Sequence, residues 1–438
     1  MKENFKQTQY DIQVYTPFEP TSRLSYAVDL VLGNILGLSY IITSTPVEDM
    51  PLINYSEDRS IGGLFIQPEK LLFEQGIRKQ DIWVAHFNGV PLFYQQPPEA
   101  GFILDIFAFA FYNASRYEEY LTDIRDEHGR FAAESSLAYK HDFLDIPLVD
   151  VWARRLGATL KLLYPELSLP DKKYSALLTV DLDQPYAFRG KGVLRNAGGL
   201  IKDMLSGRKA GRRFSCLTGR ENDPYDTYDY LNSTAEKYKC PVLYFFTTGS
   251  RSRYDKNIHP RRKCYKRLIR KLSERHETGL HVSYKSDNSE KMIAREKNIL
   301  EKVSRRNILK TRKHYLLLTL PLTYRVLSKA GIKEDYTLGF IREAGFRAGI
   351  ARPFIFYDLA EEKKSSITLV PFQYMDGTFQ KYKRFSPVES KVEVKRLIDI
   401  TREVGGLFVS IWHNTSLTEE DEWKGWRQLF EYTLREQK

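Results

Sequence analysis

The chain has 438 residues, 42% of them hydrophobic and 28% charged, and its formal net charge is +11. This length allows at least one large hydrophobic core and two or three domains. The three cysteines, Cys216, Cys240 and Cys264, include no closely spaced pair, which argues against a disulfide framework and a structural zinc site and favours reduced thiols.

The first segments of the chain give no indication of export or of membrane insertion. Residues Met1–Gln7 lack the apolar stretch of a secretory signal. The most apolar segment, Phe102–Tyr112, is interrupted by Asp105 and is much shorter than the ~20 apolar residues that a transmembrane helix needs. We therefore expect a soluble, cytoplasmic protein without a transmembrane segment.

Residues 1–170 are predicted to form a smaller α/β domain, to which the sequence assigns no role. Apolar periodicity and capping residues predict strands over 10–15, 61–66 and 91–94 and helices over 22–36, 104–120 and 149–164. We expect Arg116, Glu118 and Glu119 to form an exposed helix end, in preference to a position in a cleft. The prolines and polar residues of 165–173 predict a domain boundary.

Residues 171–438 are predicted to form a second, larger α/β domain. Strands are expected over 174–180, 241–247, 279–284, 335–340, 366–372 and 406–412, with helices over 260–275, 289–302 and 322–330. Alternation of this kind favours a parallel sheet or barrel over a sandwich. The long stretch Arg189–Asn232, between the first two strands, is expected to be an insertion over the mouth of the site.

Positive charge is concentrated in one segment of this second domain. Residues 189–275 contain 22 Lys and Arg against 8 Asp and Glu, a net charge of +14, so the rest of the chain carries −3. Solvated loops and helix faces are the simplest interpretation. Binding of an anionic glycan, an anionic membrane or nucleic acid remain alternatives, although the segment matches no nucleic-acid-binding motif.

Acids and imidazoles follow three of the expected strands at the point where each strand ends. Asp181 and Asp183 come directly after an apolar run, and His281 and His413 close two other runs. Because the carboxyl ends of parallel strands meet at one edge of a sheet, we expect these side chains to converge. Carboxylates and imidazoles at one place suit metal binding and proton transfer, so the pattern predicts a metal-dependent enzyme. Turn acids and satisfied core histidines are the alternatives.

Further candidates follow in the same region. Arg312 can pair with a site carboxylate and fix its direction, whereas His314 is a ligand, a substrate contact or a surface histidine. Asp376 is expected to make a turn. The candidate substrate-binding residues are Tyr284, Asp335, Arg347, Trp412 and Asn414.

The order of these motifs resembles that of the polysaccharide deacetylase superfamily, the NodB-homology or family-four carbohydrate esterases. Thr179–Asp183 is similar to the family's T-F-D-D motif, with one residue inserted between the acids. His281 matches the first histidine of the H-x-x-x-H motif, whose second position is Lys285 here. Arg312–Tyr315 lies where the family has R-x-P-Y, and Trp412–His413 matches the L-x-H motif.

The resemblance covers roughly residues 174–438. It implies a distorted (β/α)-barrel, preceded here by an additional N-terminal domain, in a divergent bacterial subgroup. In the family, the first acid of T-F-D-D is the catalytic base and the second binds metal. The resemblance therefore implies that Asp181 is the base, that Asp183 is a metal ligand and that Arg312 orients the base.

The cofactor implied by the resemblance is a divalent metal ion, with zinc favoured, held by Asp183, His281 and His314. His314 would replace the histidine that is missing at Lys285, and His413 would be the catalytic acid. The implied reaction removes an N-acetyl or O-acetyl group from a polysaccharide or glycan precursor. Hydrolysis of a carbon–nitrogen amide bond other than a peptide bond is favoured. The alternative is a catalytically inactive glycan-binding or scaffold protein that kept the fold.

Overall fold

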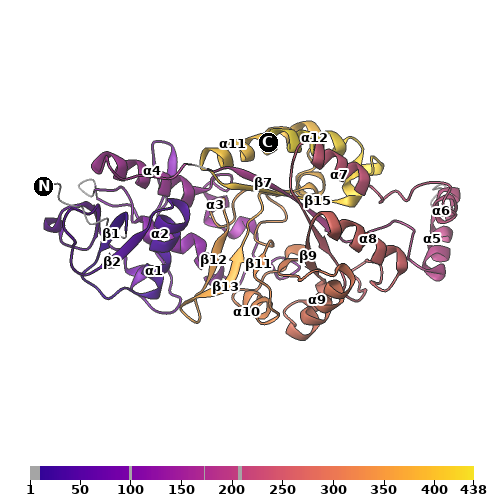
Figure 1. The fold of residues 1–438 in the computed structure, drawn as a ribbon, viewed down its shortest axis with the longest axis horizontal. Coiled ribbons are helices and arrows are strands. Elements are labelled where there is room, and N and C mark those ends of the chain that lie inside the picture. Colours follow the sequence, from indigo (N-terminus) through magenta and orange to yellow (C-terminus); the bar gives the residue numbers. More distant parts are fainter. Residues whose placement is uncertain (1–9, 98–100, 172, 206–209) are drawn as a thin grey trace, which may run out of the picture.

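The computed structural model describes residues 10–97, 101–171, 173–205 and 210–438. Met1–Gln7, which the sequence argument on export uses, lie outside these residues. Figure 1 shows an elongated molecule with the N-terminal sheet at one end, a large sheet in the middle, and α5 (Val193–Leu205) and α6 (Ala210–Leu217) at the other end. Among the described residues, no helix is both long enough and apolar enough to cross a membrane.

The N-terminal part is built on a four-stranded parallel sheet in the order β2-β1-β3-β4. The strands are β1 (Ile12–Tyr15), β2 (Tyr40–Thr43), β3 (Leu52–Tyr55) and β4 (Leu64–Ile66), with a separate antiparallel pair, β5 (Ala85–Phe87) and β6 (Val90–Leu92). The helices are α1 (Ser22–Val28), α2 (Ile106–Ala114), α3 (Leu137–Lys140) and α4 (Leu148–Leu163). This part is therefore α/β in character, whereas its independence as a domain stays a prediction.

Helix α2 accounts for the most apolar segment of the sequence. Every residue of the helix except Asn113 is buried, so α2 is a core helix. Asp105 caps it by accepting hydrogen bonds from the backbone N–H groups of Phe107 and Ala108, each at 3.0 Å. Burial raises the pKa of Asp105 to about 6. The acid that interrupts the apolar run is therefore the residue that starts the helix.

The C-terminal part contains a nine-stranded sheet in the order β12-β13-β11-β10-β9-β8-β7-β15-β14, and all neighbours are parallel except β12 and β13. The strands are β7 (Ser175–Leu182), β8 (Val242–Phe246), β9 (Glu277–Val282), β10 (Lys310–Lys313), β11 (Glu334–Asp335), β12 (Phe354–Asp358), β13 (Lys363–Leu369), β14 (Tyr374–Met375) and β15 (Leu407–His413). The helices after α6 are α7 (Tyr228–Lys237), α8 (Lys263–Arg275), α9 (Glu290–Ser304), α10 (Leu322–Lys329), α11 (Pro387–Glu403) and α12 (Trp426–Glu436). The predicted mixed α/β fold with parallel strands is confirmed.

The short segment between β13 and β14 links the two ends of the run of parallel strands. β13 pairs with β11, β14 pairs with β15, and only residues 370–373 separate them in the chain. In the hydrogen-bonded order, however, β12 and β14 are the two end strands. Closure of the sheet into a barrel therefore stays a prediction.

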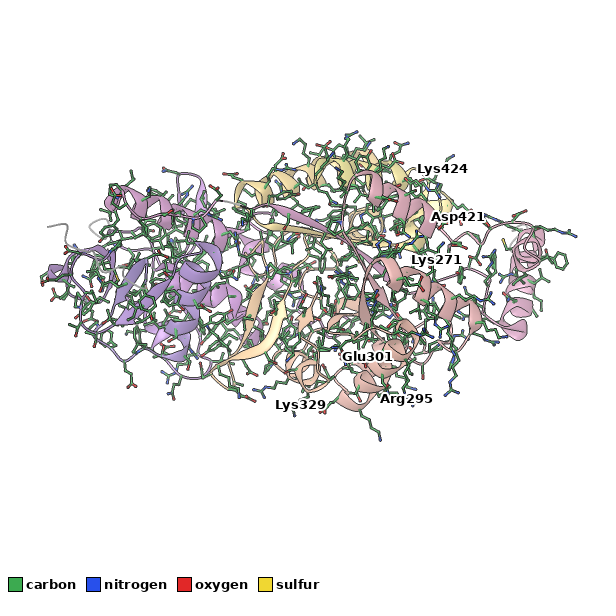
Figure 2. All side chains as sticks on the ribbon, in the orientation of Figure 1. Lys271, Arg295, Glu301, Lys329, Asp421 and Lys424 are labelled. Atoms are coloured by element: carbon green, nitrogen blue, oxygen red, sulfur yellow. The ribbon has the colours of Figure 1, made fainter. Side chains whose placement is uncertain are left out.

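The helices around the large sheet are amphipathic. In α8, for example, Leu268, Ile269 and Leu272 are buried, whereas Lys271 is exposed. Figure 2 shows charged side chains such as Lys271 and Arg295 on these outer helices. The apolar helix faces therefore cover the sheet and leave its strand ends as the place where polar side chains gather.

The largest difference from the predicted elements concerns short strands with polar residues. β10 was not predicted as a strand because its residues, Lys310, Thr311, Arg312 and Lys313, show no apolar alternation. Three of these four side chains are nevertheless buried, because they have polar partners inside the protein. The strand expected over 335–340 shortens to β11, and β12 and β14 were also not predicted.

The two parts of the chain share a continuous hydrophobic core and buried ion pairs. The carboxylate of Glu119 lies 2.8 Å from Arg116 Nε and 2.7 Å from Arg347 Nη2, and all three side chains are at most 4% exposed. The prediction of an exposed helix end is therefore wrong for Arg116 and Glu119. Their opposite charges compensate one another inside the protein, which a sequence pattern of alternating charges does not reveal.

Candidate metal centre and active site

The parallel strands bring the predicted site residues to one edge of the large sheet. In the register of the sheet, His281 on β9 lies opposite Arg312 on β10, and Asp181 on β7 lies opposite His413 on β15. Asp183 follows β7 by one residue. The expected convergence of strand ends is therefore what the structure shows.

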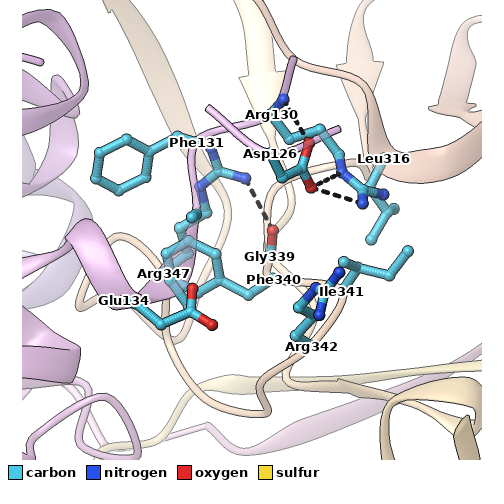
Figure 3. Close-up of a pocket in the computed structure, with 12 residues that line it drawn as sticks. Asp126, Arg130, Phe131, Glu134, Leu316, Gly339, Phe340, Ile341, Arg342 and Arg347 are labelled. Carbon is cyan, nitrogen blue, oxygen red and sulfur yellow. Dashed lines mark hydrogen bonds and ion pairs between the residues drawn. The ribbon is translucent and has the colours of Figure 1, made fainter. Parts of the chain in front are cut away.

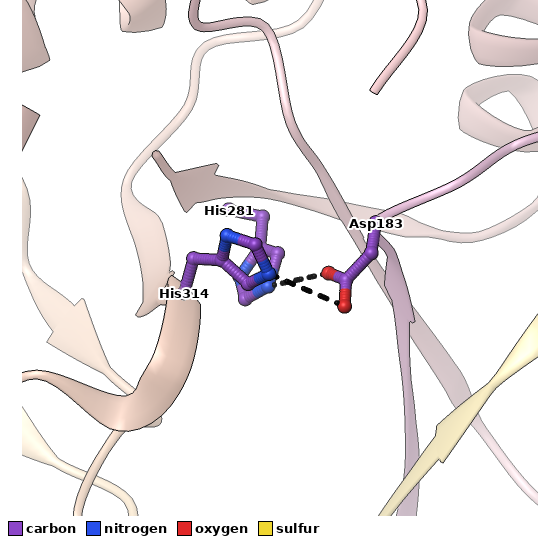
Figure 4. Close-up of side chains that lie close together, drawn as sticks. All are labelled: Asp183, His281 and His314. Carbon is purple, nitrogen blue, oxygen red and sulfur yellow. Dashed lines mark ion pairs between the residues drawn. The ribbon is translucent and has the colours of Figure 1, made fainter. Parts of the chain in front are cut away.

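Three side chains form a cluster that could hold a metal ion. Ligand atoms of Asp183, His281 and His314 all lie within 4.8 Å of one another. Figure 4 shows both imidazole rings directed at the carboxylate, with His281 Nε2 3.0 Å from Oδ1 and His314 Nε2 3.3 Å from Oδ2. The cluster contains the three residues that the sequence predicts as ligands, with His314 in place of a second histidine on the β9 loop.

The other nitrogen of each histidine is held by an acceptor. His281 Nδ1 lies 3.0 Å from the carbonyl oxygen of Arg312, and His314 Nδ1 lies 2.9 Å from Asp255 Oδ1. Because a carbonyl or a carboxylate can only accept, each Nδ1 carries the hydrogen, and Nε2 of the neutral ring presents a lone pair to Asp183. This is the arrangement in which a metal-ligating histidine is oriented by an acceptor behind it.

The donor set requires a positive charge at its centre. Asp183 Oδ1 is buried and, within the described part of the chain, accepts no hydrogen bond of acceptable geometry. The two carboxylate oxygens of Asp183 each face one imidazole lone pair, Oδ1 at 3.0 Å and Oδ2 at 3.3 Å, which is repulsive unless a cation or a proton lies between them. Two nitrogens and a carboxylate oxygen suit zinc and similar divalent ions. The residues present therefore fit a divalent metal.

The pKa values of the site residues also reflect the need for a positive charge. Burial by itself would raise the pKa of Asp183, but His314, His281 and His413 outweigh it and hold this pKa well below its ordinary value. Burial disfavours the charged form of His314, yet Asp183 and Asp255 raise its pKa to about 10. In the metal-free protein, a proton on His314 supplies the positive charge that the carboxylates demand.

Asp181 is held by an arginine beside the metal cluster. Arg312 Nη1 donates to Asp181 Oδ1 and to Thr179 Oγ1, each at 2.8 Å, and its Nε donates to the carbonyl oxygen of Tyr336 at 2.9 Å. Arg312 is fully buried, so these bonds fix its guanidinium. The second oxygen of Asp181 lies 3.9 Å from His281 Nε2, on the side of the metal cluster.

His413 faces the cluster from the opposite side. Its Nε2 lies 3.7 Å from Asp183 Oδ2, and its Nδ1 lies 2.8 Å from Asp376 Oδ1. Ser416 also donates to Asp376. Burial disfavours the charged imidazole, but Asp376 and Asp183 raise the pKa of His413 to about 9. The expectation that Asp376 only makes a turn is therefore corrected, because its buried carboxylate orients and charges His413.

A cavity of about 290 Å³ opens onto these residues. Its lining includes Asp181, Asp183, His281, His314 and His413. Tyr254 and Tyr315 also line it, and they join Tyr284 and His128 in an aromatic cluster with ring-centre distances from 4.2 to 5.7 Å. A polar floor beneath an aromatic wall suits a ring-shaped polar ligand such as a sugar.

A second, smaller cavity of about 150 Å³ adjoins the first, since Leu316 and Ile341 line both. Residues 126–134 of the N-terminal part form one wall, and Figure 3 shows Arg130 paired with Asp126 there. Arg130 Nη1 also donates to the carbonyl oxygen of Tyr315 at 2.7 Å. Tyr315 and Leu316 have φ of 60° and 54°, a costly conformation for non-glycine residues, so the N-terminal part supports a strained turn at the metal cavity.

The predicted substrate-binding residues differ in their positions. Tyr284 belongs to the aromatic cluster at the metal cavity. The other four side chains are buried, and none of the five lines that cavity, although Arg347 lines the second one. Asp335 bonds Thr337, Arg347 bonds Glu119, Trp412 bonds Tyr374, and Asn414 bonds the carbonyl oxygens of Gln184 and Tyr225. Their side chains therefore have protein partners in the positions where we expected substrate.

The sequence did not identify Asp255, it assigned Asp376 only to a turn, and it misplaced one segment. Asp255 lies in the loop after β8, not directly after an apolar run, and orients His314. Asp376 directly follows β14 and orients His413. The described residues between Arg189 and Asn232 do not line the metal cavity, and Figure 1 shows α5 and α6 at the far end of the molecule. The prediction of an insertion over the mouth is therefore wrong for these helices.

Comparisons with known proteins give separate results for the two parts of the chain. Residues 12–165 match a family described as a family of unknown function, DUF7033. No curated protein matches the chain. The DUF7033 match ends before the metal cluster and leaves the C-terminal part unassigned.

Three of the solved structures that resemble this chain are two polysaccharide deacetylases and a mutant pseudoenzyme of the CE4 family. A candidate polysaccharide deacetylase from Mycobacterium smegmatis is 16% identical, with a TM-score of 0.40, over 61% of this chain and 86% of that one. The polysaccharide deacetylase Bc1974 from Bacillus cereus is 11% identical, with a TM-score of 0.29, over 60% and 85%. A mutant of BA3943, a CE4 family pseudoenzyme with restored activity, is 12% identical, with a TM-score of 0.25, over 60% and 64%. At these identities and TM-scores the likeness carries no argument about function.

Proposed function

We propose that this protein is a metal-dependent hydrolase that removes acetyl groups, N-acetyl groups in the first place, from sugars of a polysaccharide or glycan precursor. The observation that carries the proposal is the cluster of Asp183, His281 and His314, with the Arg312-bound carboxylate of Asp181 on one side and the charged imidazole of His413 on the other. Motifs in the order of the polysaccharide deacetylases, described above, supply the reaction class.

The chain's own residues have distinct roles in this proposal. Asp183, His281 and His314 would hold a divalent ion, with zinc favoured. When bound, such an ion polarises an acetyl carbonyl and lowers the pKa of a water molecule. Asp255 and the carbonyl oxygen of Arg312 keep the two imidazoles turned toward the ion.

Proton transfer is assigned to the two groups beside the cluster. Asp181, oriented by the hydrogen bond from Arg312 at 2.8 Å, accepts the proton of the attacking water. His413, whose pKa is raised to about 9, is protonated at neutral pH and donates to the leaving group. An amine leaving group needs such a donor more than an alcohol does, which favours an amide over an ester as substrate.

The proposal is tested by metal analysis and acetate release on the same preparations. Wild-type protein should hold about one equivalent of zinc or a similar metal and release acetate from at least one member of a panel of acetylated glycans. Asp183→Ala should lose both properties. Asp399→Ala, which removes an exposed carboxylate on α11, is the matched control and should change neither.

The outcomes separate the proposal from its rival. Wild-type protein that holds no metal and releases no acetate would overturn the hydrolase and support the glycan-binding scaffold. Bound metal with release from O-acetylated but not N-acetylated glycans would retain the site and change the bond that is cleaved.

A further inference from the structure

A third cavity, which we call the basic cleft, lies in the segment of highest positive charge. It has a volume of about 480 Å³, and Lys191, Arg195, Arg251 and Arg262 line it together with His259. Its lining contains no acidic side chain. The charge of residues 189–275 is therefore partly organised around a cavity.

The four cations of the cleft lack acidic partners. Within the described part of the chain, none of Lys191, Arg195, Arg251 and Arg262 forms an ion pair, whereas Arg212 of the same segment pairs with Glu420. Arg195 donates only to backbone, at 3.0 Å to the carbonyl oxygen of Lys256. Asp223 acts on Lys191 only through its charge and forms no ion pair with it. Cations that converge on a cavity without ion-pair partners favour the arrival of an anion.

The surroundings of the cleft also favour an anion there. Burial, followed by the charge of Arg195, lowers the pKa of Lys191 to about 8. Gly192 has a φ of 83°, and a Cβ atom there would come within 3.1 Å of Arg262 Nη2. A glycine at this position therefore leaves room for the guanidinium at the edge of the cleft.

The basic cleft adjoins the metal cavity. Tyr254 and Lys256 line the metal cavity, whereas Asn257 and His259 of the same loop line the cleft. A second segment repeats the pattern, since Gln184 lies at the metal cavity and residues 190–192 lie at the cleft. The same two segments of the chain therefore line both cavities.

We propose that the basic cleft binds a carboxylate or phosphate group carried by the same glycan whose acetylated sugar occupies the metal cavity. Guanidinium groups bind both anions through paired hydrogen bonds. The protein would thus select acidic over neutral acetylated glycans. This inference rests on the proposed function, which places the acetylated sugar in the metal cavity. Anion binding in the cleft can nevertheless be measured without turnover.

The test compares two labelled oligosaccharides that share N-acetylglucosamine. Hyaluronan hexasaccharide carries carboxylates, and chitohexaose is neutral. Binding is measured by fluorescence anisotropy at low salt for the wild type, for Arg251→Ala/Arg262→Ala, and for Arg220→Ala/Arg267→Ala as a control. The control removes two exposed arginines of the same segment that do not line the cleft.

We expect the cleft variant to weaken hyaluronan binding at least tenfold and the control less than twofold, with chitohexaose binding unchanged in both. Added salt should weaken only the hyaluronan complex. An equal loss in the control would overturn the proposal, because the attraction would then be diffuse.

Three further results would also overturn it. One is equal wild-type affinity for the two sugars. Another is that inorganic phosphate binds, that hyaluronan does not, and that phosphate binding is lost in Arg251→Ala/Arg262→Ala, which would mean a site for free anions. The third is that single-stranded RNA binds more tightly than hyaluronan and that the same variant weakens RNA binding. Acetate release and metal content are recorded in parallel, so a failure of the proposed hydrolase is recognised separately.

Discussion

Two carboxylates, the buried Glu119 and the half-buried Asp183, each lie among basic side chains, and their surroundings differ in one respect. Glu119 receives permanent donors, because guanidinium groups of Arg116 and Arg347 lie 2.7 to 2.9 Å from it. Asp183 faces His281 and His314, whose only hydrogen in the neutral form is committed to another acceptor.

This difference separates a structural site from a site prepared for an ion. The carboxylate of Glu119 is satisfied, and despite burial the two arginines lower its pKa to about 2. The carboxylate of Asp183 is satisfied only if a proton or metal arrives. The number of basic side chains near a carboxylate is therefore less informative than the acceptor to which each of them already donates its hydrogen.

The largest effect is expected when the metal-side carboxylate is neutralised. Asp183→Asn should remove stoichiometric metal and lower the rate of acetate release about 10³-fold or more, because several kcal/mol of transition-state stabilisation is lost. Metal content and steady-state kinetics measure this. Full metal content in the variant would contradict the ligand assignment.

The corresponding change at the structural site should act on folding. Glu119→Gln leaves the buried Arg347 without its anion and Arg116 with Glu118 alone, and should lower the free energy of unfolding by about 3–5 kcal/mol. Because folding depresses the pKa of Glu119, its contribution is present above its ordinary pKa of 4.5 and is lost as pH falls toward about 2. Denaturation at pH 7 and pH 3 measures both effects. An unchanged metal content per folded protein is the control.

The next effect concerns the group behind His314. Asp255→Asn keeps the size of the side chain but weakens its hold on His314 Nδ1, and metal affinity should fall about 10–100-fold. Competition with a chelator measures the affinity. Asp229→Asn, an exposed aspartate on α7, should leave it unchanged.

A smaller effect is expected on the pH dependence. Activity requires protonated His413 and should be lost as pH rises through its pKa of about 9. Asp376→Asn removes the main group that raises this pKa, so the alkaline limb should move down toward the ordinary value of 6.5. A pH profile of kcat that keeps its alkaline limb in the variant would assign that limb to another group.

The smallest effect is expected at Lys285. Its side chain is exposed and does not line the metal cavity, so Lys285→His should change neither the metal stoichiometry nor, by more than about twofold, the metal affinity. A second equivalent of metal in this variant would show that the loop can still supply a ligand.

The sequence predicted the parts of the site that follow apolar strands. Asp181, Asp183, His281 and His413 lie at the carboxyl ends of parallel strands, and strand polarity alone brings them together. His314 had three possible roles, and only the resemblance to the deacetylases favoured that of a ligand, because β10 has no apolar pattern. Asp255 could not be found, since it acts through a loop whose path depends on tertiary contacts. Asp376 was assigned to a turn, because its pairing with His413 depends on the packing of β14 beside β15.

The fold also divides into elements that the sequence predicted and contacts that it did not. Long apolar or amphipathic segments such as α4 and β7 were predicted within two residues. The buried pairing of Arg116 with Glu119 was not, because two opposite charges near each other in sequence are equally compatible with a solvated helix end. Burial of charges is decided by partners such as Arg347, which is distant in the chain.

The contact between Arg130 and the carbonyl oxygen of Tyr315 has a consequence for evolution. Loss of the N-terminal part would remove, in one step, the donor that steadies the turn at the metal cavity and the anion opposite Arg347. The C-terminal part could not then be recombined freely with other modules. We expect relatives to carry both parts together, or to have replaced Arg347 and the Tyr315 turn at the same time.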